Sequence, residues 1–122
     1  MINNYIHIFI AVYFIAVGCN KKVQDEGLSQ IKSKGYDLYI KHACNTCHSL
    51  DGARMNGPTF KNLYQKRVYF YNDSSIIVDE EYLINSIINP GKEIVKGYPD
   101  LMPSYNLTKD EIDALIDFIK KQ

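Results

Sequence analysis

The 122-residue chain has few cysteines and histidines, and it has no excess of charge of either sign. It contains three cysteines and three histidines, and its 14 Lys and Arg residues balance its 14 Asp and Glu residues. Without a basic excess or a long basic run, nucleic-acid binding is not expected. The length allows one small domain at most. The sequence shows no internal repeat or low-complexity segment.

Two of the cysteines and one histidine stand together in Cys44-Asn45-Thr46-Cys47-His48. C-x-x-C-H is the attachment signature of c-type haem, in which each thiol can add to a haem vinyl group and the histidine can bind the iron. The motif predicts one covalently attached haem c. Cys44 and Cys47 would hold the porphyrin, and His48 would be an axial ligand of the iron.

Other uses of this motif lack the residues or the context that they need. A thioredoxin-like redox pair requires a βαβ unit, and no strand leads into Cys44. A structural zinc site requires a second pair of ligands at close spacing. The remaining candidates, Cys19, His7 and His42, form no such pair. A plain disulfide between the two motif cysteines would leave the histidine without a role.

Three helices and a short hairpin are predicted after Gly35. A helix over residues 35–43 leads into the haem motif. A second, over 79–88, has Asp79 as its N-cap and acidic residues in its first turn, and it stops at Pro90. The third begins at a capping box formed by Thr108 and Glu111 and has apolar residues at helical spacing. Residues 69–78, with a turn at 72–75, predict the hairpin.

The order of these features resembles a class I cytochrome c, and most closely the cytochrome c domain of haem-copper oxidase subunit II. The stretches that carry the resemblance are residues 47–52, 57–60, 79–83, 86–90 and 95–103. The resemblance implies an all-α domain over residues 35–122, with three to four helices around one covalently attached haem. It also implies that Gly35 and Tyr39 pack the first helix against Leu115 and Phe118 of the last.

Met102 is the expected second axial ligand, on the grounds of the resemblance and of elimination. Met1 would be removed with an export signal, and Met55 follows His48 too closely to reach the opposite face of the porphyrin. His42 is the rival ligand, but it is expected to point outward from the entering helix.

The resemblance implies two further roles around the haem. The carbonyl of Pro58 would accept a hydrogen bond from the far nitrogen of His48 and so orient the ring. Relatives commonly carry Gly-Arg where this chain has Gln65-Lys66-Arg67. Lys66 and Arg67 are therefore the candidate contacts of the haem propionates.

The amino-terminal residues predict a targeting segment rather than part of the folded domain. Residues 1–20 contain no Lys, Arg, Asp or Glu, and they are almost wholly apolar from Tyr5 to Gly18. This indicates an export signal over residues 1–18. Residues 15–19, Ile-Ala-Val-Gly-Cys, resemble a bacterial lipoprotein box, which implies cleavage before Cys19 and lipidation of Cys19. Residues 19–34 are mostly polar and predict a flexible tether.

An uncleaved anchor and an ordinary cleaved signal are the alternatives for this segment. About 20 uncharged residues are enough to span a bilayer. Lys21 and Lys22 follow the apolar run, however, and would tend to hold the following domain in the cytoplasm. That orientation conflicts with the resemblance, which implies haem attachment outside the cytoplasm. The expected location is the extracytoplasmic side of a bacterial membrane.

With both axial positions filled by protein, no site remains for a small-molecule substrate. The expected function is therefore electron transfer between ferrous and ferric haem, without enzyme activity. A membrane-tethered carrier of a respiratory chain, with a terminal oxidase or a quinol-oxidising complex as partner, fits these features. The alternatives are a peroxidase-like or gas-binding haem protein with an open sixth position, and a fixed electron-entry subunit of a larger oxidase or dehydrogenase.

Overall fold

The computed structural model describes residues 34–122. The predicted export signal, Cys19 and the tether up to residue 33 lie outside the described residues. Among the residues described, no helix is long and apolar enough to cross a membrane. Along the chain, a helix over residues 34–41 is followed by η1 (Cys44–Thr46), β1 (Arg67–Tyr69), β2 (Ser75–Ile77), α3 (Glu80–Ile88), η2 (Pro90–Lys92) and α4 (Lys109–Ile119).

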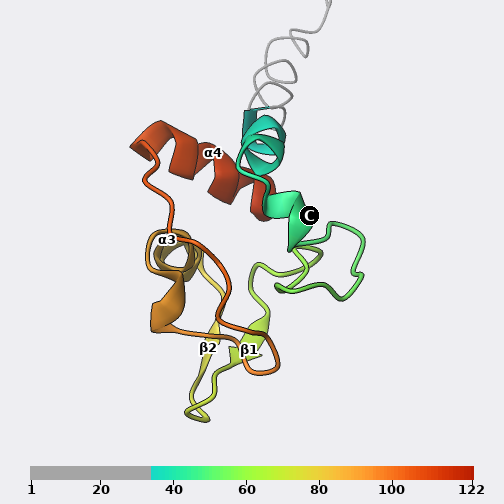
Figure 1. Ribbon diagram of the computed structural model, residues 1–122, viewed down its shortest axis with the longest axis vertical. Helices are drawn as coiled ribbons and strands as arrows, with labels where there is room; N and C mark the ends of the chain where they lie inside the picture. Colours follow the sequence, from blue (N-terminus) through green and yellow to red (C-terminus); the bar gives the residue numbers. More distant parts are fainter. Residues whose placement is uncertain (1–33) are drawn as a thin grey trace, which may run out of the picture.

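The helix of residues 34–41 packs closely on α4, and Figure 1 shows the two side by side at one end of the molecule. A Cβ atom on Gly35 would lie 2.3 Å from the carbonyl oxygen of Ala114 and 2.4 Å from the Cβ of Phe118. The ring of Tyr39 lies 5.5 Å from that of Phe118. The predicted packing on Phe118 is therefore present, and Gly35 also lies against Ala114. The helix also includes Lys34, which the sequence had assigned to the tether.

The caps of α3 and α4 form as predicted. The carboxylate of Asp79 accepts a hydrogen bond from the backbone N–H of Tyr82 at the start of α3. Thr108 and Glu111 form a full capping box at the start of α4. An ion pair between Lys120 and Glu80 links the end of α4 to the start of α3. These signals are local, so the sequence alone was enough to place both helices.

The predicted hairpin is present, but its first strand begins two residues earlier. Arg67 pairs with Ile77 and Tyr69 pairs with Ser75, so Ser75 belongs to a strand rather than to the turn. The turn lies between Tyr69 and Ser75, and Asp73 in it has a positive φ of 61°. Phe70 forms a bridge with Val95, which attaches the hairpin to the segment after η2.

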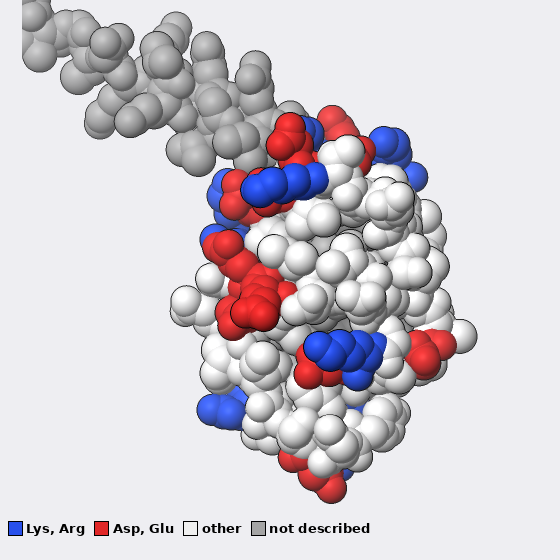
Figure 2. All heavy atoms as spheres, turned by 90° about the vertical axis from the view of Figure 1, so that its left-hand side faces the viewer, with Lys and Arg blue, Asp and Glu red and all other residues white. Residues whose placement is uncertain are grey.

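One hydrophobic core joins the elements, and the hairpin lies at the end of the molecule opposite α4 (Figure 1). Phe118 and Val78 are the largest fully buried side chains. The mostly helical fold with one short hairpin confirms the predicted fold class. Figure 2 shows Lys and Arg side chains beside Asp and Glu side chains on one face, with uncharged surface between them. This mixed pattern agrees with the balanced formal charge of the chain.

Candidate haem-binding site

The haem motif forms a compact turn directly after the first helix. Ala43, two residues beyond the end of that helix, has the left-handed conformation, with φ 55° and ψ 26°. This conformation is unusual for a residue with a Cβ atom and costs about 1–2 kcal/mol. The carbonyl of Cys44 then accepts hydrogen bonds from the backbone N–H groups of Cys47 (3.1 Å) and His48 (2.9 Å). The turn therefore presents both thiols and the imidazole from one short segment.

The imidazole of His48 is oriented by two neighbouring groups, and a third holds the backbone of the same residue. Its Nδ1 lies 2.7 Å from the carbonyl oxygen of Pro58. A carbonyl can only accept, so Nδ1 carries the proton and Nε2 keeps its lone pair. The ring of Phe60 stacks on the imidazole with centroids 4.7 Å apart. The hydroxyl of Tyr39 donates to the backbone carbonyl of His48 at 2.5 Å.

Burial lowers the pKa of His48 below its ordinary value of 6.5, while the hydrogen bond to Pro58 opposes that shift. The imidazole is therefore neutral at neutral pH, which is the form that binds a metal. The predicted role of Pro58 as the hydrogen-bond partner of His48 agrees with this geometry.

The loop after the motif returns to it and fixes Pro58 from both sides. The backbone N–H of Gly57 donates to the carbonyl of Cys47, and that of Phe60 donates to the carbonyl of Ser49, each at 2.8 Å. A Cβ atom on Gly57 would lie only 2.4 Å from Cε1 of His48. Glycine is therefore required here, because any side chain would displace the ring. No role of Gly57 could be predicted from the sequence, although it directly precedes Pro58.

A cavity of about 360 Å³ opens beside the motif, within the size range of cofactor sites. Cys44, Cys47, His48, Pro58 and Met102 all contribute to its wall. Much of the remaining wall is apolar and includes Leu63, Leu83, Ile87, Leu115 and Ile119. Four of the predicted site residues thus come from the motif and its loop, and the fifth comes from a segment more than forty residues further along the sequence.

Cys44 and Cys47 carry free thiols and are both half-buried, whereas Asn45 and Thr46 between them are exposed. Burial raises the pKa of the Cys44 thiol. The motif therefore lies where the cavity meets the surface, with its sulfur atoms available for covalent attachment. Two thiols, a neutral imidazole and a thioether around one apolar cavity fit a covalently attached haem.

The two methionines of the described residues differ in their relation to the cavity. Met102 lines the cavity and is partly buried against the core, whereas Met55 does not line it. Pro99 and Pro103 restrict the backbone on either side of Met102. The structure therefore places the predicted sixth ligand, rather than its competitor Met55, at the site.

The prediction that His42 points outward is wrong. Its ring packs edge-on against Tyr105, with centroids 5.5 Å apart. Its Nε2 exposes less than 1 Å² of surface and has no hydrogen-bond partner. His42 is nevertheless one of the residues that line the cavity, so it lies inside the molecule rather than on its outer face. The ring therefore points inward and packs against Tyr105.

Lys66 and Arg67 are not among the residues around the main cavity. They line an adjoining cavity of about 350 Å³, which shares Pro58, Leu63, Val95 and Tyr98 with the first. Arg67 donates a hydrogen bond to the hydroxyl of Ser75 at 3.1 Å. The structure thus puts both cations near the cavity, across a shared wall, rather than inside it.

The small helical fold and a cavity with the C-x-x-C-H motif in its wall define a domain of the c-type cytochrome class. A family model described as Cytochrome c matches residues 33–122, well over half of the chain. The chain therefore belongs to the cytochrome c family, whose domain implies covalently bound haem c with its iron. No curated protein matches the chain at a significant level.

Proposed function

We propose that this protein is a monohaem electron carrier in which His48 and Met102 are the two axial ligands of the iron. Membership of the cytochrome c family supports a haem-based electron-transfer protein. The observation that carries the finer proposal is that His48 and Met102 line one cavity, although they come from separate segments of the chain. With both positions filled, the chain has no open site for a substrate.

Bound haem supplies a one-electron couple between the ferrous and ferric states of iron. The chain supplies the surroundings that tune this couple. His48 contributes a neutral nitrogen held by Pro58, and the soft sulfur of Met102 favours the reduced state relative to a second nitrogen. The apolar wall excludes water and acts in the same direction. Cys44 and Cys47 would fix the haem edge that lies nearest the protein surface, where a redox partner can approach.

The proposal includes export and attachment to the extracytoplasmic side of a bacterial membrane. It is supported by the uncharged run over residues 1–18, by the lipoprotein-like residues that end at Cys19, and by the polar segment that follows them. A tethered carrier could move between fixed complexes of a respiratory chain. The likeness to the oxidase-linked cytochrome c domain favours a terminal oxidase or a quinol-oxidising complex as partner.

The ligand assignment is tested by Met102→Ala, with Met55→Ala as the matched control. Loss of the sulfur ligand should abolish the sulfur-to-iron charge-transfer band, lower the reduction potential and allow carbon monoxide to bind the ferrous protein rapidly. Met55→Ala should leave all three properties unchanged. An unchanged spectrum in Met102→Ala, or rapid carbon monoxide binding by the native protein, would contradict His48/Met102 ligation.

A further inference from the structure

The segment that carries Met102 is held by few polar contacts. It runs from η2 back to α4, and residues 99–107 form no helix or strand (Figure 1). Within residues 34–122, every hydrogen bond made by residues 99–107 involves Tyr105. Residues 95–98, by contrast, are joined to the hairpin through Tyr71 and to the loop after the haem motif through Arg54.

Tyr105 joins this segment to two other parts of the molecule. Its hydroxyl donates to the backbone carbonyl of His42 at 3.0 Å. Its backbone N–H donates to the carbonyl of Ile87, in the last turn of α3, at 3.3 Å. Its ring also packs against the ring of His42. Because His42 lies two residues before Cys44, the contact ties the Met102 segment to the start of the haem motif.

We propose that Tyr105 is a positioning residue that holds the Met102 segment closed over the cavity and thereby controls access to the sixth position of the iron. This inference rests on the proposed ligation by Met102. Tyr105 follows Met102 by three residues, so opening its contacts frees the chain on the carboxyl side of the ligand. The prolines at 99 and 103 limit bending within the segment, so Tyr105 and Met102 would move together.

The contacts of Tyr105 should affect the rate at which an external ligand binds the iron, and not the identity of the two axial ligands. An external ligand can reach the iron only after Met102 leaves, and the open population depends on the contacts that must break first. Removing one hydrogen bond of ordinary strength should raise the open population about fivefold to tenfold. The spectrum of the closed state should remain that of the native protein.

The test uses the haem-loaded full chain and measures the rate at which imidazole binds the ferric protein. Tyr105→Phe keeps the ring but removes the hydroxyl, and it should accelerate binding about fivefold to tenfold. Because the same bond is absent from the unfolded chain, the melting temperature should also fall by a few degrees. Tyr36→Phe is the matched control, because its ring packs on Phe118 of α4, and it should bind imidazole at the native rate. An unchanged rate in Tyr105→Phe would overturn the role of Tyr105.

The same experiment separates this inference from the ligand assignment. If the native protein itself binds imidazole without a slow opening step, Met102 is not the ligand, and the proposed function fails in its finer form. If native binding is slow and Tyr105→Phe matches it, only the role of Tyr105 fails. Amide hydrogen exchange of the native protein gives a second test. The amide of Tyr105 should be protected relative to those of Ser104 and Asn106, and equal exchange would contradict the proposal.

Discussion

At the residue scale, the position of the His48 ring depends on the absence of a side chain at Gly57. The space that a side chain at position 57 would occupy is already taken by the imidazole. The carbonyl of Pro58 then holds Nδ1 of the same ring. Gly57 therefore leaves room for the imidazole of His48, and Pro58 orients it.

Gly57→Ala should destabilise the haem-loaded protein by about 1–3 kcal/mol, because overpacking forces a ring or a backbone segment to move. Chemical denaturation measures the free energy of unfolding, and the absorption spectrum reports displacement of His48. Gly91→Ala is the matched control. A Cβ atom there would meet nothing closer than the carboxylate of Asp100 at 3.7 Å, so the substitution should be tolerated. Equal effects of the two substitutions would contradict the role assigned to Gly57.

The sequence predicted the part of the site that depends on short motifs. Cys44, Cys47, His48 and Pro58 could be named because their spacing or their family resemblance carries the chemistry. The contacts of Tyr39 with the carbonyl of His48, the stacking of Phe60 and the anchoring by Tyr105 could not be predicted. Each depends on how segments distant in the sequence approach one another, and the same dependence explains the error about the direction of His42.

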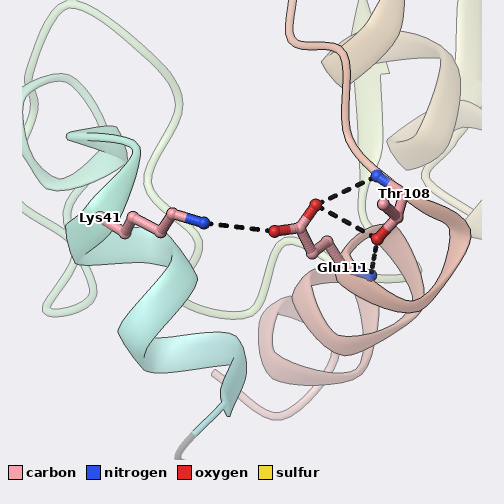
Figure 3. A network of polar contacts seen from close by, with 3 residues as sticks. All are labelled: Lys41, Thr108 and Glu111. Atoms are coloured by element: carbon pink, nitrogen blue, oxygen red, sulfur yellow. Dashed lines mark hydrogen bonds and ion pairs between the residues drawn. The ribbon is translucent and has the colours of Figure 1, made fainter.

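At the scale of secondary-structure elements, the start of α4 is joined to the end of the first helix through Glu111. Figure 3 shows its carboxylate between Thr108 and Lys41. It accepts hydrogen bonds from the backbone N–H of Thr108 at 3.1 Å, from the Thr108 hydroxyl at 3.2 Å, and from Lys41 at 3.3 Å. The bond from the Thr108 backbone is the main cause, and that from Lys41 the second, of the lowering of the Glu111 pKa below 4.5.

This lowered pKa gives a prediction with a defined sign. The unfolded chain binds the proton of Glu111 more readily, so the stabilising contribution is complete above the unfolded pKa and is lost as the pH falls through the folded pKa. Wild-type protein should be more stable than Glu111→Gln at about pH 7, and the difference should close toward about pH 3. Thermal unfolding across this pH range measures it.

Lys41→Ala provides the comparison for this prediction, since it removes the second cause and leaves the hydrogen bonds from Thr108. The stability of Lys41→Ala should therefore keep most of its dependence on pH. A difference between wild type and Glu111→Gln that stays constant with pH would show that the carboxylate contributes only through its shape and hydrogen-bonding capacity.

Prediction from the sequence succeeded for α3 and α4 because their caps and apolar faces are encoded within a few residues. It was less accurate for the hairpin. The first strand begins at Arg67, and the backbone N–H of Lys96 donates to the carbonyl of Tyr69 at 2.7 Å. Lys96 lies beyond α3 in the sequence, so this contact could not be predicted from the local pattern of residues 66–78.

At the scale of the whole molecule, the domain of residues 34–122 and the proposed amino-terminal targeting segment would have separate roles. The domain contains the haem site, whereas the tether would decide where that site works. The surface of the domain carries mixed charges (Figure 2), so net charge alone does not select a partner. Location would then limit which complexes the carrier meets.

Cys19→Ser should yield a protein without attached lipid and with an unaltered haem spectrum, because the acylated thiol would be lost while the haem site is untouched. The masses of the purified native and Cys19→Ser proteins, each with its haem, measure the effect. An uncleaved anchor and an ordinary cleaved signal both predict that the native protein carries no lipid on Cys19.

The most direct test of the central claim is a pyridine haemochrome assay of the purified protein, together with the absorption spectrum of its reduced form. The account predicts one haem per chain, with the spectrum of a haem whose two vinyl groups are both saturated by Cys44 and Cys47. That haem should resist extraction by acidified organic solvent. A haem that extracts freely, a spectrum with unsaturated vinyl groups, or a chain without haem would contradict the account.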